Sequence, residues 1–213
     1  MPLTIRPLTP ELWPQLEDLF GPTRGACNGC WCMYWRIGGA YSRRPREENK
    51  RDFRRIVDEG PPPGLLAFSG DLAVGWCQLT PRGDIPYIES KRLYLAVDQA
   101  PVWSISCFYV RRGWRKKGVT TALIEAAADA ARVGGAPALE AYPIDPQKPM
   151  GAGNLYTGLA SSFRRAGFHE VARRAPARPI VRLDLTLAVI PDGAAQRRRS
   201  GTAKGAGACR GPG

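Results

Sequence analysis

The stretch VWSISCFYVRRGWRKKGVTTALIEAAADAARV, residues 102–133, decides how this chain folds. Its first part, 102–110, is rich in β-branched and aromatic residues, which predicts a strand. A basic, glycine-containing loop follows over 111–118. The last part, 119–133, predicts a helix, because apolar residues recur there at helical spacing and a Gly-Gly pair ends the pattern. The predicted inward face of this helix consists of Val119, Leu123, Ala126, Ala130 and Val133.

A strand, a basic loop and a helix in this order can hold phosphate groups. The first turn of a helix has N–H groups without partners, and the helix dipole adds partial positive charge there. Gly118 lets an anion approach the backbone, and Arg115, Lys116 and Lys117 add positive charge. Neither a Walker loop nor the Gly-x-Gly-x-x-Gly dinucleotide fingerprint is present in the loop. We therefore expect a diphosphate held in another setting.

The loop resembles the acetyl-CoA motif of the GNAT superfamily of N-acetyltransferases. In that motif the strand ends in Val, an Arg or Gln follows five residues later, and x-x-Gly-x-Gly/Ala comes next; Val110, Arg115 and Gly118 match in register. Thr120 replaces the final small residue of the motif. The alternative is a basic surface turn before an Ala-rich helix. By the resemblance, the acetyl-CoA site comprises Phe108, Tyr109, Val110, Arg115, Lys116, Lys117, Gly118, Val119 and Thr120.

The resemblance also implies a fold and a reaction. The expected fold is mixed α/β, of α+β type, with a mostly antiparallel sheet of six or seven strands flanked by about four helices. The expected reaction moves an acetyl group from acetyl-CoA to an amine of a small molecule or peptide, by direct attack in a ternary complex. A backbone N–H at the splayed end of the strand 104–110 would bind the thioester oxygen.

The remaining elements are read from local patterns in chain order. A hairpin and closing antiparallel strands argue against a doubly wound parallel fold. Pro14 is expected to bend the first helix. The segment 80–100 has no clear assignment. The predicted strands are 3–8, 65–68, 72–79, 138–142, 169–174 and 180–187, and the predicted helices are 10–20, 45–59 and 154–166.

Charge and composition narrow the class of protein. The chain has 213 residues, which suggests one domain, 1–190, and a Gly/Ala/Arg-rich tail, 191–213, expected to be disordered. The net charge of +12 requires an anionic partner; +4 of it lies in the tail, and the loop 111–117 carries five positive charges. This concentration fits CoA phosphates better than nucleic acid. With no leader peptide or membrane-spanning run, we expect a cytoplasmic location, and a homodimer is left open.

A second informative segment contains Cys27, Cys30 and Cys32 in a Cys-x-x-Cys-x-Cys pattern. A structural zinc site usually needs four ligands, and no second Cys or His pair follows at the spacing of a zinc finger, so we expect no metal. The rival class is a basic protein that binds metal or nucleic acid through this segment and the tail; a third option binds CoA without acyl transfer. By resemblance, Trp31, Tyr34 and Trp35 are candidate walls of the acceptor site, and plain core packing is the alternative.

Two residues are candidates for acid–base chemistry. Glu140 lies on a short apolar strand, where partial burial could raise its pKa and let it act as the general base, with Glu89 and Asp98 next in line. An exposed edge strand would also explain a carboxylate there. In GNAT proteins a helical Tyr often acts as the acid, but Phe163 occupies that position here. Tyr156, two helical turns earlier, is the candidate for an acid or positioning role. Cys107, on the central strand, is expected to be an inert buried thiol.

Overall fold

The computed structural model describes residues 2–21, 29–147 and 155–185. In these residues one seven-stranded sheet has the order β1-β2-β3-β4-β5-β7-β6. All neighbouring strands are antiparallel except β4 and β5, which are parallel. The strands are β1 Thr4–Pro7, β2 Gly64–Ser69, β3 Leu72–Pro81, β4 Trp103–Val110, β5 Ala138–Ala141, β6 His169–Arg173 and β7 Pro179–Asp184. The mixed, mostly antiparallel fold predicted from the sequence is confirmed.

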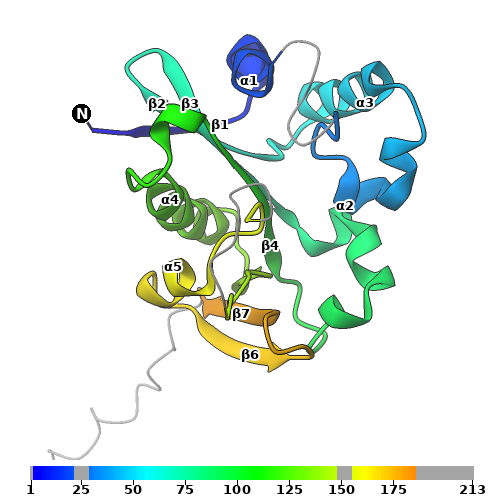
Figure 1. The fold of residues 1–213 in the computed structure, drawn as a ribbon, viewed down its shortest axis with the longest axis vertical. Helices are drawn as coiled ribbons and strands as arrows, with labels where there is room; N and C mark the ends of the chain where they lie inside the picture. The colour runs from blue at the N-terminus through cyan, green and yellow to red at the C-terminus, as the bar shows by residue number, and fades with distance from the viewer. Residues whose placement is uncertain (1, 22–28, 148–154, 186–213) are drawn as a thin grey trace, which may run out of the picture.

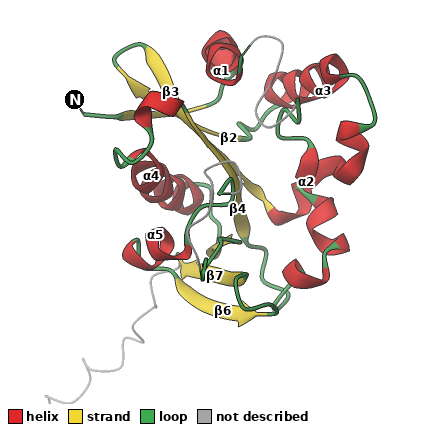
Figure 2. Ribbon diagram, in the orientation of Figure 1, coloured by secondary structure: helices red, strands yellow, loops and turns green. Residues whose placement is uncertain are grey.

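Helices lie on both sides of this sheet (Figure 1). The α-helices of the described residues are α1 Trp13–Phe20, α2 Tyr34–Ile37, α3 Arg46–Glu59, α4 Val119–Val133 and α5 Ala160–Arg165. Short 3-10 helices fill the connections: η1 Pro10–Leu12, η2 Gly38–Ser42, η3 Arg82–Asp84, η4 Pro86–Ser90, η5 Arg92–Tyr94 and η6 Arg112–Trp114. The segment 80–100, left unassigned by the sequence, is therefore mostly 3-10 helix (Figure 2).

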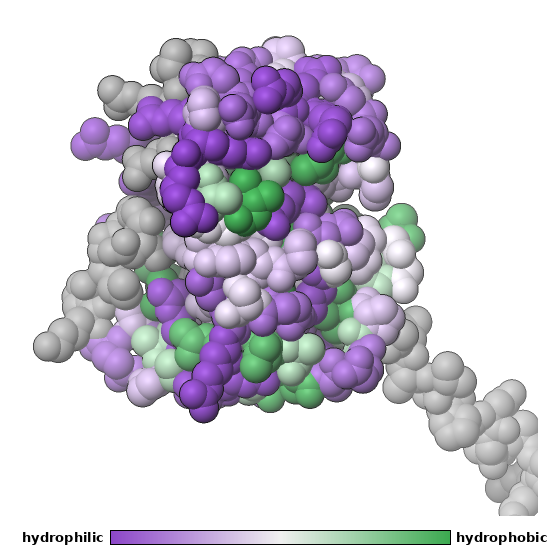
Figure 3. Space-filling model, turned by 90° about the vertical axis from the view of Figure 1, so that its right-hand side faces the viewer, coloured by the Kyte–Doolittle hydropathy of each residue, from purple (hydrophilic) through white to green (hydrophobic). Residues whose placement is uncertain are grey.

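The sheet separates two main apolar layers. On one face, α4 packs Leu123 and Ile124 against Ile105 of β4 and Leu139 of β5. On the other face, residues of α1, α3 and the segment before α2 surround Trp76 of β3. Figure 3 views the side of the molecule on which α2 and α3 lie: hydrophilic side chains cover its upper part, and apolar side chains gather below them.

The parallel pair β4–β5 is short, and this creates the feature on which the site depends. Only Trp103, Ser104 and Ile105 of β4 pair with β5. Beyond Ile105 the two strands part, while β4 stays paired with β3 up to Val110. Backbone groups alternate in direction along a strand, and the Arg111 N–H bonds to the β3 side, so the peptide groups at Ser106, Phe108 and Val110 point away from β3 into the split.

Some details of the sequence reading were wrong. The predicted helix 154–166 begins only at Ala160, because the residues before it form a turn that enters the split. Pro14 lies at the start of α1, where it costs no helical hydrogen bond, and does not bend the helix. The buried face of α4 is rotated from the predicted one: its members are Val119, Leu123, Ile124, Ala127, Ala128 and Ala131, and Val133 is 91% exposed.

The tail 191–213, and with it part of the predicted strand 180–187, lies outside the described residues, as do Cys27 and Asn154.

Candidate functional site

The N-terminus of α4 has the geometry expected of a phosphate site. Gly118 is the residue before the helix, is exposed, and has φ +80°, a left-handed conformation that a residue with a Cβ rarely adopts. Its carbonyl accepts the first helical bond, from Ala122 N–H at 3.0 Å. The buried side chain of Val119 fixes this end of the helix on the core. The N–H groups of the first turn therefore lack acceptors within the helix.

The cationic side chains of the basic loop differ in whether they are free to bind a ligand. Arg115, Lys116 and Lys117 are exposed beside Gly118. Arg115 Nε donates to the carbonyl of Val110 at 3.3 Å, and Lys117 Nζ lies 5.2 Å from the centre of the Trp114 ring. Arg111 differs, because it donates to the carbonyl of Ala73 and pairs with Asp18 at 2.5 Å. Arg111 is thus held by the fold, whereas 115–117 carry charge toward solvent near the helix end.

Two contacts occupy the split edge of β4. The indole Nε1 of Trp35 donates to the carbonyl of Ser106 at 3.0 Å. The N–H of Phe108 donates to the carbonyl of Tyr156 at 2.6 Å. Strand alternation points the Phe108 carbonyl and the Val110 N–H into the same split. A row of backbone groups suited to an extended amide chain therefore leads away from Phe108 toward the basic loop.

The segment around Tyr156 reaches the split because it pairs with the chain leaving β5. Ile144 and Leu159 form a parallel bridge, with Ile144 N–H bonded to Gly158 O at 2.9 Å and Ala160 N–H to Ile144 O at 2.8 Å. Gly158 has φ +80°, and a Cβ there would lie 2.9 Å from Phe163 and 3.2 Å from Phe108. A glycine is therefore required to bring Tyr156 against β4.

An aromatic cavity of about 260 Å³ opens beside this split. Its floor is formed by Gln78 of β3 and Cys107 of β4, which are register partners in the sheet. No charged side chain lines it among the residues that the structure describes. The lining residues are Cys30, Cys32, Tyr34, Trp35, Tyr41, Gln78, Cys107 and Tyr156.

The predicted acceptor residues divide between this cavity and the core. Tyr34 and Trp35 line the cavity, with ring centres 4.7 Å apart. Burial raises the pKa of Tyr34, so its phenol stays neutral. Trp31 is not in the lining: it is 1% exposed and stacks on Trp13 at 5.7 Å. Trp31 therefore lies in the core, which was the alternative to a place in the acceptor site.

Gln78 is a cavity residue that the sequence reading missed. It is fully buried, and its Nε2 donates to the carbonyl of Cys32 at 3.4 Å. Its Oε1 has no hydrogen-bond partner in the described part of the chain. The signal was present in the sequence, since Gln78 is the one amide in the otherwise apolar strand 72–79. Only the fold shows that this amide meets a cavity.

Tyr156 also lies at the cavity, although the predicted helix is not what places it there. Its carbonyl bonds to Phe108 and its side chain lines the cavity, so one residue joins the split and the cavity. Burial raises the pKa of its phenol, which therefore stays protonated at neutral pH.

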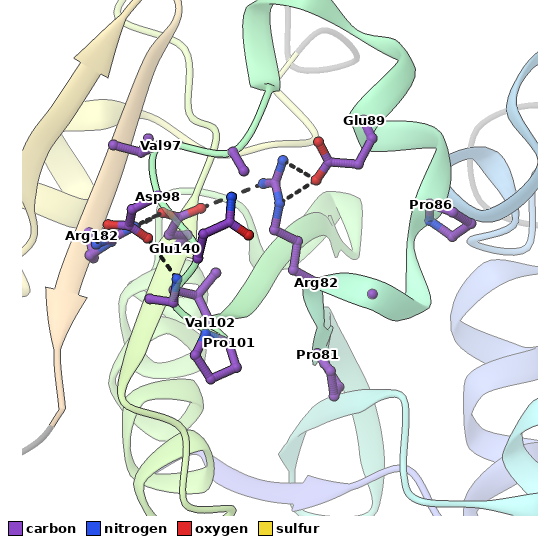
Figure 4. A pocket seen from close by; sticks show the side chains of 14 residues that line it. Pro81, Arg82, Pro86, Glu89, Val97, Asp98, Pro101, Val102, Glu140 and Arg182 are labelled. Carbon is purple, nitrogen blue, oxygen red and sulfur yellow. Dashed lines mark hydrogen bonds and ion pairs between the residues drawn. The ribbon is translucent and has the colours of Figure 1, made fainter.

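Glu140 lies at a different cavity, of about 370 Å³ (Figure 4). It is 1% exposed on an interior strand, so the alternative of an exposed edge is wrong. Its Oε1 accepts from Arg182 at 2.7 Å, and its Oε2 lies 3.5 Å from Arg82. The hydroxyl of Tyr142 donates to Oε2 at 3.2 Å. The carboxylate is thus fixed between two guanidinium groups.

This polar cavity shares no lining residue with the aromatic one among the residues that the structure describes. Glu140 pairs with Ser104, which is roughly 13 Å along β4 from Phe108. The rings of Trp35, Tyr94 and Tyr142 pack in sequence near it, with centres 5.6 and 5.5 Å apart. The two reserve candidates for a base, Glu89 and Asp98, line the polar cavity and pair with Arg82 and Arg182. The structure therefore does not bring these carboxylates to the aromatic cavity.

The cysteines of the aromatic cavity are packed among large rings. Cys30 and Cys32 are buried, and Trp76 Nε1 donates to Cys32 Sγ at 3.1 Å. Cys107 is also buried, at the cavity floor. Within the described ranges, no group of three or more His, Cys, Asp or Glu side chains has a geometry that could hold a metal.

Comparison with known proteins agrees with this geometry. Residues 27–156, more than half of the chain, match the family described as Acetyltransferase (GNAT) family. The chain belongs to this family. It is therefore an acyltransferase, as the sequence motif predicted. None of the curated proteins matches the chain.

Solved structures of GNAT proteins share the fold at low sequence identity. An N-acetyltransferase from Staphylococcus aureus Mu50 is 13% identical, with a TM-score of 0.52 over 87% of this chain and 100% of its own. The loading GNATL domain of CurA from Lyngbya majuscula is 13% identical, with a TM-score of 0.53 over 87% and 98%. A chain of the NatC complex bound to Gag peptide and CoA is 12% identical, with a TM-score of 0.51 over 87% and 100%.

The helices of the described residues include none that is long and apolar enough to span a membrane.

Proposed function

We propose that this acyltransferase moves the acetyl group of acetyl-CoA to the amine of a small acceptor, by direct attack in a ternary complex. The observation that carries the proposal is the order of three features along β4: the N-terminus of α4 beyond its end, its split edge, and the aromatic cavity at Cys107. These features offer N–H groups and positive charge at one end and an apolar chamber at the other. Those are the groups that a diphosphate, an extended amide arm and a thioester require in that order.

Each of these features has a role in this proposal. The first-turn N–H groups after Gly118, with Arg115, Lys116 and Lys117, bind the diphosphate. The Phe108 carbonyl and the Val110 N–H bind the amide arm. The Phe108 N–H exchanges the Tyr156 carbonyl for the thioester oxygen, so it stabilises the negative charge that develops there during attack.

Tyr156 lies where the reacting groups would meet. Its phenol, protonated because burial raises its pKa, can donate a hydrogen bond to the departing sulfur. A CoA thiolate, like a Cys thiolate with a pKa of ~8.5, leaves without much help, so this contribution is expected to be modest. Glu140 as general base remains a prediction, and its pairing with Arg182 and Arg82 favours a structural role instead.

The test of this function is a thermal shift with acetyl-CoA. A ligand present at about a hundredfold above its dissociation constant stabilises a protein by roughly 2.7 kcal/mol, which is a shift of several degrees. Gly118→Asp should abolish the shift, because it places bulk and negative charge at the diphosphate. Gly135→Asp is the matched control at the other end of α4: Gly135 has φ +74°, and a Cβ there meets no atom within 4 Å, as at Gly118. If wild type shows no shift, or both variants lose it equally, the cofactor assignment fails.

A further inference from the structure

The aromatic cavity contains one buried polar atom whose hydrogen-bonding capacity is unused. Gln78 presents its Nε2 to the carbonyl of Cys32. If the amide were flipped, Gln78 Oε1 would face the carbonyl oxygen of Cys32, and both atoms are acceptors. Oε1 is therefore the amide atom that points away from Cys32. Leaving a buried acceptor without a partner is costly unless something else occupies it. Gln78 Oε1 is therefore ready to accept a hydrogen from a bound molecule.

In the part of the chain that the structure describes, no carboxylate lines the cavity around this oxygen. The lining side chains that carry an ionisable proton are cysteines and tyrosines, and none is a carboxylic acid. Around Tyr34, Tyr156 and Cys32, the charged groups that act from neighbouring elements are cations. Lys91 and Arg178 act on Tyr34, Arg178 also acts on Tyr156, and Arg36 acts on Cys32. The described lining thus gives an ammonium ion aromatic faces but no carboxylate as counter-ion, and nearby cations oppose it.

This electrostatic setting bears on the acceptor of the acetyl group. An alkylammonium with a pKa of ~10.4 is uncharged in about one molecule in 2,500 at pH 7. Without a carboxylate among the described lining residues, the cavity has no group to hold the ion or to take its proton. A weakly basic amine enters already neutral. It then has N–H groups to donate and a free lone pair for attack.

We propose that the cavity selects a small apolar amine in its neutral form, of the arylamine class, and that Gln78 Oε1 accepts one of its N–H groups. This inference rests on the proposed acetyl transfer and adds the acceptor class and a positioning residue. The cavity, at about 260 Å³, is smaller than a typical drug-sized site and matches an acceptor of one ring. A hydrogen bond from N–H to Gln78 turns the nitrogen lone pair away from Gln78 and leaves it free to face the thioester.

The reaction balances without a further reactant. The amine nitrogen bonds to the carbonyl carbon, the carbon–sulfur bond breaks, and the electron pair leaves on sulfur. The proton lost by the nitrogen ends on that sulfur as the thiol of CoA. The products are the N-acetyl amine and CoA, and no carboxylate base is needed for an amine that enters neutral.

The experiment compares two amines of similar shape, aniline and cyclohexylamine, by release of free CoA from acetyl-CoA between pH 6 and 10. For aniline, uncharged across this range, kcat/KM should be nearly flat with pH. For cyclohexylamine it should rise about tenfold per pH unit, because only the neutral fraction reacts. Gln78→Leu should lower kcat/KM for aniline at least tenfold and leave the acetyl-CoA thermal shift unchanged. Gln15→Leu is the matched control, since Gln15 in α1 also has an unpartnered Oε1 but does not line the cavity.

A second variant separates positioning from structure. Gln78→Glu places a carboxyl group there whose pKa is raised by burial, so it should raise the rate of cyclohexylamine relative to aniline at the pH values where this group ionises, toward the upper end of the range from pH 6 to 10. A merely structural Gln78 would change both amines alike. The inference is overturned if Gln78→Leu acetylates aniline as wild type does, or if Gln78→Glu leaves the ratio of the two rates unchanged at every pH from 6 to 10. It is also overturned if wild type binds acetyl-CoA and acetylates neither amine. If wild type fails to bind acetyl-CoA at all, the proposed function falls instead.

Discussion

The two cavities of this enzyme lie on the same side of the sheet, but they differ in whether their buried polar side chains have partners within the protein. In the polar cavity, Glu140 is paired with Arg182 and Arg82, and Asp98 with Arg182 (Figure 4). In the aromatic cavity, the buried oxygen of Gln78 has no partner in the described part of the chain. A side chain whose bonds are all satisfied by the fold has little left for a substrate. An unsatisfied one retains its capacity to bind.

This difference changes which residue the chemistry should be assigned to. A carboxylate on an apolar strand attracts attention in the sequence, because charged residues are rarely buried. In the structure that carboxylate is part of an ion-pair network, and such networks also account for buried charge. The less conspicuous amide at Gln78 is the group with a free position beside the split strand.

The largest expected contrast between the cavities is in stability. Glu140→Gln removes the anion that two partly buried guanidinium groups share and leaves each with its other carboxylate, so the free energy of unfolding should fall by about 2 kcal/mol, less than when a buried ion pair loses its sole partner. Gln78→Leu removes an acceptor that has no partner and one long hydrogen bond, of 3.4 Å, to the carbonyl of Cys32, so its unfolding free energy should stay within about 1 kcal/mol of wild type. Urea denaturation measures both.

In activity the order of the two variants should be reversed, with Gln78→Leu losing more than Glu140→Gln. Well below its melting temperature, Glu140→Gln should keep a kcat within about threefold of wild type, because Glu140 does not line the aromatic cavity. A Glu140→Gln enzyme with normal stability and a kcat reduced tenfold or more at neutral pH, recovering at high pH, would return the role of general base to Glu140.

Tyr156, at the junction of the split and the aromatic cavity, is expected to contribute less to turnover than a general base would. Tyr156→Phe removes the phenolic hydroxyl and keeps both the ring and the backbone carbonyl that accepts from the Phe108 N–H. We expect kcat to fall about tenfold, at or below the lower end of the range for acid catalysis, because the thiolate is a fair leaving group. The dissociation constant of acetyl-CoA, measured by calorimetry, should not change. A rate equal to wild type would remove Tyr156 from the mechanism.

The smallest effect is expected at the rim of the polar cavity. The hydrogen bond from Arg182 lowers the pKa of Asp98 below its ordinary value of 3.8. A lowered pKa stabilises the fold above the ordinary value, and this contribution is lost as the pH falls through the folded pKa. Asp98→Asn should therefore lower the melting temperature slightly at pH 7, and this difference should shrink as the pH falls below 3.8. A difference that stays the same down to the lowest pH at which the protein folds would show that the ion pair is not its source.

The sequence predicted the cofactor half of this site because that half is local. Val110, Arg115, Gly118 and the helix that follows lie within one short stretch, and their order alone defines strand, loop and helix. The inward face of α4 was misplaced because alanines on every side of the helix blur its stripe. Ile124, beside Leu123, shifts the buried face around the helix.

The acceptor half could not be predicted because it is assembled from distant segments. Cys32, Gln78, Cys107 and Tyr156 meet only when the sheet has formed. Tyr156 was chosen for its helical spacing, yet it lies in a turn before the helix, held by Gly158. The burial and pairing of Glu140 depend on Arg82 and Arg182, which are far from it in the sequence.

A crystal structure with CoA bound tests the central claim most directly. The account predicts the diphosphate on the first turn of α4 beside Gly118, with the amide arm along Phe108 and Val110. It also predicts the sulfur at the mouth of the aromatic cavity, and the Phe108 N–H released from the carbonyl of Tyr156. CoA bound elsewhere, with the Phe108 N–H still bonded to Tyr156 and the first turn of α4 vacant, would contradict it.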